Sequence, residues 1–171
     1  QDNTVGRFFT YFVAALHTAY PDACPLLSQL LQSIPLPASS YLADLLVAEL
    51  GELPGGILFV LDDFHHVQNV ETQQVVETLL AHAPRSLHLV IISRLDPPLP
   101  LARLRVQNEI NEIRAADLRF SVEEAEQFFG RTLTTALSTE LVRKLDERAE
   151  GWAAGLRLAA LSLQDRPDPE T

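Results

Sequence analysis

Apolar residues recur every three or four positions through the first fifty residues of the chain, which is the spacing of a buried helix face. The first such helix is expected to end near Tyr20, before a proline, and it can be capped by one of three polar residues: Asp2, Asn3 or Thr4. The same spacing predicts two further helices, one over residues 26–32 and one that carries Leu42 to Leu50 and ends near Gly51. The second of these is expected to be capped by Ser39 or Ser40.

Two stretches rich in apolar residues follow, Ile57–Leu61 and Leu87–Ile92; the first is wholly apolar, and the second contains one polar residue, His88. Runs of this kind are typical of parallel strands covered by helices on both faces. Between them, Asn69 can cap a helix that reaches about His82. A strand, a helix and a strand in this order predict a βαβ unit with two parallel strands.

The rest of the chain is mainly helical in pattern. Residues 111–115 form a weak third strand candidate, after a proline-rich loop and a short helix over 101–105. Ser121 and Glu124 form a capping box that starts a helix ending at Gly130, and two more helices are predicted over 139–149 and 152–163. We therefore expect an α/β domain over residues 1–118, a small helical portion over 119–164 and a linker over 165–171.

Composition narrows the possible functions. The net charge of −10 and the pI of about 4.8 would repel a phosphate backbone, so we expect no DNA binding by this chain. No apolar run approaches the roughly 18 residues of a membrane span. The single cysteine, Cys24, fits a reducing compartment, and we expect a cytoplasmic protein. The chain begins at Gln1 and has no methionine, which predicts that it belongs to a longer protein.

Charged residues follow both apolar runs. Asp62 and Asp63 come directly after the first run, where ligands of parallel α/β sheets bind. A hydrophobic strand ending in two acids is the Walker B pattern, in which the first acid holds Mg²⁺ and the second orients the attacking water. Arg94 follows the second run and can sense a terminal phosphate. The structural alternatives are a turn in which the acids accept backbone amides, and an ion pair between Arg94 and Asp96.

A phosphate-binding loop is missing from the chain. Such a loop needs the pattern GxxxxGK[ST]. The glycines of residues 51–56 have the right spacing, but Ile57 follows them, and the only lysine is Lys144. Without this lysine we expect the isolated chain to bind no nucleotide and to be inactive as an enzyme.

Residues 62–66 also contain the residue types of a metal centre. Asp62, Asp63, His65 and His66 offer carboxylates and imidazoles, which both bind transition metals. Adjacent side chains on an extended segment point to opposite sides and cannot easily share one ion, so we expect no metal in the isolated chain.

Several segments together resemble the nucleotide-binding domain of the large ATP-dependent LuxR-type transcriptional regulators of the maltose-regulon-activator type, which belong to the STAND class of AAA-like NTPases. The resemblance covers nearly the whole chain. Its four motifs are similar to the Walker B strand, the sensor strand with its loop, the start of the helical lid and the glycine-containing lid helix, and they lie at residues 56–65, 89–105, 112–125 and 150–159.

This resemblance implies a partial P-loop-NTPase-like α/β fold of three layers, with a parallel sheet flanked by helices and followed by a small helical lid. In the parent protein it implies that ATP and Mg²⁺ are bound, with Asp62 at the Mg²⁺, Asp63 orienting water and Arg94 sensing phosphate. ATP binding and hydrolysis would control self-association and transcription activation in response to an unknown inducer. The Walker A segment would lie before Gln1. Many relatives carry a proline in the lid motif where this chain has Ala153.

Two other functions stay open on the residues alone. The chain can be an α/β protein-interaction module without catalysis, because it has no phosphate loop. It can also be a metal-dependent hydrolase that uses Asp62, Asp63, His65 and His66.

Overall fold

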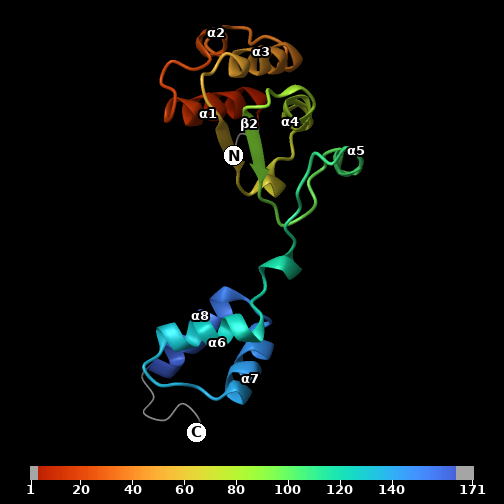
Figure 1. Ribbon diagram of the computed structural model, residues 1–171. Coiled ribbons are helices and arrows are strands. Elements are labelled where there is room, and N and C mark those ends of the chain that lie inside the picture. Colours follow the sequence, from red (N-terminus) through yellow and green to blue (C-terminus); the bar gives the residue numbers. More distant parts are fainter. Residues whose placement is uncertain (1–3, 165–171) are drawn as a thin grey trace. The chain divides into compact units, whose positions relative to one another are not determined.

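The computed structural model describes residues 4–164, and the chain forms two compact units, Gln1–Gln107 and Asn108–Thr171. Figure 1 shows the helices and strands of each unit. The elements of the first unit are α1 (Val5–His17), α2 (Pro25–Leu30), α3 (Ser39–Gly51), β1 (Ile57–Leu61), the 3-10 turn η1 (Phe64–His66), α4 (Val70–His82), β2 (Leu87–Ile91) and α5 (Leu101–Gln107). Those of the second are η2 (Ala115–Leu118), α6 (Val122–Thr132), α7 (Thr139–Ala149) and α8 (Ala153–Gln164). The predicted linker over 165–171 and the cap candidates Asp2 and Asn3 lie outside the described residues.

The two predicted strands form a small parallel sheet, which confirms the α/β class and the βαβ unit. Ile57 lies opposite Leu87, and the register continues to Leu61 opposite Ile91. The crossover helix α4 begins as predicted, because the Asn69 side chain accepts a hydrogen bond from the Thr72 backbone N–H at 2.9 Å.

The predicted third strand over 111–115 is wrong. Residues 111–114 are irregular, and Ala115–Leu118 form a 3-10 turn. The Arg114 backbone N–H donates to the Asp117 carboxylate at 2.7 Å, and the Asp117 N–H donates to the Arg114 carbonyl at 2.9 Å. These local bonds occupy the N–H and carbonyl groups of Arg114, which a strand would have offered to a neighbour.

The capping predictions have mixed outcomes. Ser121 and Glu124 form the expected box, because each side chain accepts a hydrogen bond from the other residue's backbone N–H. The caps expected at Ser39 and Ser40 are wrong: both residues lie inside α3, and Ala38 is the N-cap.

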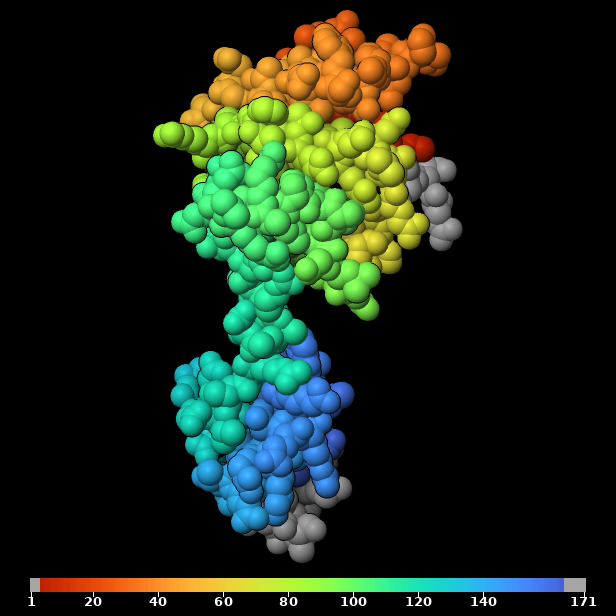
Figure 2. Space-filling view, turned by 90° about the vertical axis from the view of Figure 1, so that its right-hand side faces the viewer, coloured from red at the N-terminus to blue at the C-terminus, as the bar shows by residue number. Residues whose placement is uncertain are grey.

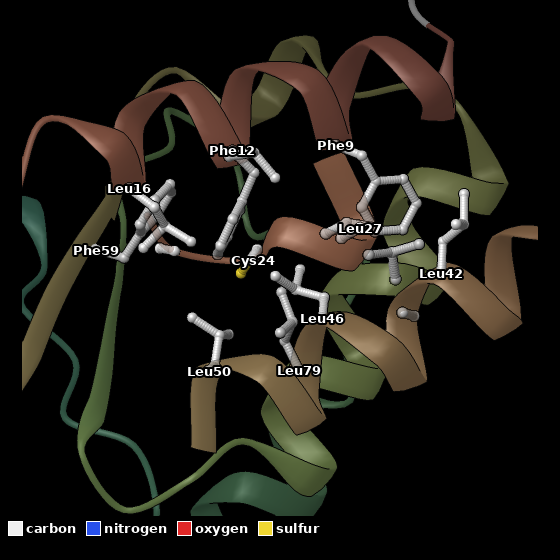
Figure 3. Packing of buried hydrophobic residues seen from close by; sticks show 14 of the residues in the cluster. Phe9, Phe12, Leu16, Cys24, Leu27, Leu42, Leu46, Leu50, Phe59 and Leu79 are labelled. Atoms are coloured by element: carbon white, nitrogen blue, oxygen red, sulfur yellow. The ribbon is translucent and has the colours of Figure 1, made fainter. Parts of the chain in front are cut away.

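The core of the first unit lies between α1, α2, α3, α4 and one face of the sheet. Its members approach from all of these elements (Figure 3), and they include Phe9, Phe12, Leu16, Leu27, Leu42, Leu46, Leu50, Phe59 and Leu79. Phe12 of α1 stacks on Phe59 of β1, with ring centroids 3.9 Å apart and planes 13° apart. This stacked pair joins the first helix directly to the strand that ends in the two acids.

The opposite face of the sheet is not covered by the described residues. Leu58, Val60 and Val90 are 68%, 49% and 38% exposed, whereas Ile57 and Phe59 are buried. Among residues 4–164, helices flank the sheet as expected but bury only one of its faces, so the expectation of cover on both faces is wrong for the described part of the chain. Side chains alternate across a strand, so a helix layer on one face leaves every second apolar residue open.

The second unit has a separate core. It is built from one face each of α6, α7 and α8 and contains Ala125, Phe129, Val142, Leu156 and Ala160. Across residues 4–164, no helix combines the length and the apolar character needed to cross a bilayer.

Phe59→Ala should lower the free energy of unfolding of the first unit by about 3–5 kcal/mol, because it removes a buried ring and leaves a cavity. Leu58→Ala, one residue earlier on the open face, should cost less than about 1 kcal/mol. Urea unfolding followed by far-UV circular dichroism measures both. Trp152 lies in the second unit, so the unfolding transition seen by its fluorescence should not move. If both variants lowered the free energy of unfolding equally, the assignment of Phe59 to the core and Leu58 to the open face would be wrong.

Candidate functional site

The carboxyl ends of both strands are tied together by backbone hydrogen bonds. The Ile92 N–H donates to the Leu61 carbonyl at 2.9 Å, and the Phe64 N–H donates to the Ile92 carbonyl at 2.9 Å. Asp62 and Asp63 therefore leave β1 at the edge where Arg94 follows β2. In Figure 1 the arrow of β2 points toward the short turn η1 at this edge.

All three predicted site residues are exposed at this edge. Asp62, Asp63 and Arg94 present their side chains to solvent. Within residues 4–164, Arg94 forms no ion pair with either acid. The structure thus brings their backbones to one rim and leaves their side chains unconnected to one another.

The two acids occupy a tight turn. Asp63 has a left-handed backbone, with φ 51° and ψ 37°, which aspartate tolerates better than most residues. The Asp63 N–H donates to the Asp62 carboxylate at 2.8 Å. Asp62 therefore accepts a backbone amide within the turn, as the purely structural explanation of these acids predicts. The side chain of Phe64 is only 1% exposed, and its burial anchors the turn to the rest of the first unit.

The turn continues as a 3-10 helix, which sequence reasoning did not predict. The His66 N–H donates to the Asp63 carbonyl at 2.9 Å, and the imidazoles of His65 and His66 lie with centroids 4.1 Å apart. The segment is not extended, so the objection that neighbouring side chains diverge does not apply here. Asp63, His65 and His66 offer three metal-ligating atoms within 4.8 Å of one another, and Asp62 is not part of this group.

A shallow cavity of about 300 Å³ lies beside this turn. Figure 2 shows the yellow surface near residue 65 next to the green surface near residue 95. The cavity is lined by η1, the loop after it, the first turn of α4 and the proline-containing loop after β2. The lining residues are Phe64, His65, Val67, Gln68, Gln73, Ser93, Leu95, Asp96, Pro97 and Pro98. Gln73 fixes the first loop by donating to the Val67 carbonyl at 2.9 Å. Neither acid nor Arg94 lines it.

Cys24 has the environment of a structural thiol. It is 1% exposed, and burial, with the nearby charge of Glu49 as a smaller cause, raises its pKa from 9.0 to about 11. The Glu49 carboxylate accepts hydrogen bonds from the backbone N–H groups of Leu26 and Leu27 at 2.9 and 3.0 Å. A thiol held in this way is unsuited to nucleophilic catalysis.

Cys24 in the folded chain should therefore react slowly with a thiol reagent such as DTNB, because it is covered and because its raised pKa leaves little thiolate below about pH 9. The same chain in denaturing urea should react fast. Absorbance of the released thiolate follows both reactions; equal rates would show that the thiol is open in the folded state.

The backbone just before α8 in the second unit depends on one glycine. Gly151 has φ +70°, and a Cβ there would lie 2.9 Å from the Arg119 Cβ and 3.0 Å from the Phe120 carbonyl oxygen. The Gly151 carbonyl accepts a hydrogen bond from the Phe120 N–H at 2.8 Å. This bond joins the segment before α8 to the segment before α6. Ala153 is the first residue of α8, a position that accepts proline readily.

Gly151→Ala should destabilise the second unit by about 1–3 kcal/mol, because alanine is strained at positive φ and its Cβ meets backbone atoms. Gly130→Ala is the matched control: it lies within α6 with open space around it, and alanine there should stabilise by about 0.5–1 kcal/mol. Trp152 fluorescence during urea unfolding reports both changes. The same sign for both variants would contradict the role given to Gly151.

These features define a parallel α/β unit with two acids and an arginine after neighbouring strand ends, followed in the chain by a three-helix unit with its own core. No protein-family model matches the chain.

The sequence is similar to a segment of several curated proteins named HTH-type transcriptional regulator MalT. It is 36% identical over 162 residues to the protein from Yersinia enterocolitica and 34% identical over 164 residues to that from Serratia proteamaculans. It is 35% identical over 162 residues to the protein from Yersinia pestis. These alignments cover 95–96% of this chain, and the chain spans about 18% of the length of these relatives.

Proposed function

We propose that this chain is a segment of the ATP-binding signalling domain of a LuxR-type transcriptional regulator. In the parent protein, ATP binding and hydrolysis would control self-association and transcription activation in response to an inducer. The similarity to MalT regulators over almost the whole chain supports the regulator assignment. The proposed binding and hydrolysis of ATP are supported by the geometry of the strand ends.

The observation that carries this proposal is the bonded edge of the sheet. Leu61 and Ile92 are joined by a backbone hydrogen bond, so the Walker B acids and the candidate sensor arginine follow neighbouring parallel strands. Parallel α/β sheets bind their ligands outside this edge. The proposed P-loop-like architecture contains such a parallel pair, although residues 4–164 supply helices on only one face of the sheet, so the third layer would come from another part of the parent protein.

Each residue has a separate role in the proposed site. Asp62 would bind the Mg²⁺ of the nucleotide, since carboxylate oxygens are ligands that Mg²⁺ prefers. Asp63 would orient the attacking water, and Arg94 would hold the terminal phosphate by charge-assisted hydrogen bonds. All three side chains are exposed and able to reach a ligand at this rim.

This proposal assigns the phosphate loop to another part of the parent protein. The 171 residues contain no GxxxxGK[ST] pattern, so the isolated chain would bind no ATP. The second unit would serve as the start of the helical lid. We place the parent protein in the cytoplasm, where ATP and DNA are both present.

A second candidate function is an interaction module without nucleotide chemistry. The observation that favours it is the open apolar face of the sheet at Leu58, Val60 and Val90, since large exposed apolar surface often marks an interaction site. The two candidates differ in one measurable property, the binding of Mg²⁺–ATP by a longer form of the protein.

A form of the parent protein that includes a phosphate loop should hydrolyse ATP, and Asp62→Asn should lower the rate at least ~100-fold by removing a metal ligand. Asp44→Asn is the control, because Asp44 is an exposed acid on α3 away from the strand ends. Phosphate release measures both variants. Hydrolysis that survives Asp62→Asn would refute the assigned role, and Mg²⁺–ATP binding at equilibrium would exclude the interaction module.

A further inference from the structure

The 3-10 turn η1 gathers three ligand-bearing side chains that the proposed nucleotide chemistry uses only in part. Asp63 is the N-cap of this turn, and the His66 N–H donates to the Asp63 carbonyl at 2.9 Å, which brings the two residues close together. His65 joins them, because its ring packs against that of His66. The three side chains each offer one ligand atom, and these atoms lie within 4.8 Å of one another.

The ligand atoms of this group are spaced somewhat more widely than those of an occupied metal centre, and all lie within 4.8 Å of one another. Zinc binds imidazole nitrogen and carboxylate oxygen at about 2.0–2.2 Å, so tetrahedral ligand atoms lie roughly 3.4 Å apart. His65 Nδ1 and the nearer Asp63 carboxylate oxygen are 3.8 Å apart. Asp63 and His66 are exposed, so small side-chain rotations can complete the approach.

His65 adds an independent observation. Its Nδ1 atom is buried and has no hydrogen-bond partner within the described residues. A buried polar atom without a partner carries a desolvation cost, and a bound cation would satisfy it. The His65 side chain is only 14% exposed, so its ring is already held in place by the turn and the neighbouring loop.

We propose that Asp63, His65 and His66 form a binding site for a divalent transition-metal ion of the zinc type. Two nitrogens and one oxygen suit Zn²⁺, and they are a poor set for Mg²⁺, which prefers oxygen ligands in octahedral geometry. Three protein ligands leave a fourth position for water or for a group from a ligand.

Isothermal titration of the tag-free 171-residue chain with Zn²⁺ at neutral pH tests this site. We expect saturable binding of one ion per chain, and millimolar Mg²⁺ should not displace it. Asp63→Asn and His66→Gln should each weaken Zn²⁺ binding at least ~10-fold, because the loss of outer-shell partners alone costs that much. Both residues are exposed, so both variants should keep the circular dichroism spectrum of the folded chain.

His82→Gln is the matched control. His82 is an exposed histidine in the last turn of α4, outside the group of three, and its replacement should leave the affinity unchanged. The proposal is overturned if the chain shows no one-to-one binding, if His66→Gln keeps the full affinity, if His82→Gln loses it, or if Mg²⁺ displaces the zinc. The measurement uses no nucleotide, so its outcome is independent of the proposed ATP chemistry.

Discussion

The parallel pairing of β1 with β2 determines where every candidate functional group of the first unit lies. Its last two hydrogen bonds, from Ile92 to Leu61 and from Phe64 to Ile92, reach past the regular strands and into the turn that carries the acids. The stack of Phe12 on Phe59 then fixes the same strand to α1. Because the turn is anchored to both strands, any shift in register would move Asp62, Asp63 and Arg94 relative to one another.

Much of the first unit was predictable because its signals are local. Two apolar runs separated by a capped helix imply a parallel pair, and Asn69 makes the expected cap contact. The capping box of Ser121 and Glu124 is equally local, since its groups are three residues apart. The backbone position of the candidate site follows from the same pattern, because residues after parallel strands share one edge.

Other features depend on contacts that no local pattern records. The run Ile57–Leu61 is apolar on both faces, yet only one face is covered by described residues, and hydrophobicity alone does not reveal whether a second layer is present. Glu49 caps α2 across 22 residues of sequence. The 3-10 turn at His65 was missed because its hydrogen bonds depend on the left-handed Asp63, for which the sequence offers only the weak signal of an aspartate after a strand.

Asp63 belongs to both proposed sites, and this links them. In the nucleotide site its carboxylate must face the water that attacks the terminal phosphate. In the metal site the same carboxylate must turn toward His65 and His66. One side chain cannot meet both demands with the same oxygen atoms. If both sites operate, a transition metal bound at η1 would compete with water orientation, and the short distance from His65 to Asp63 is the physical origin of that competition.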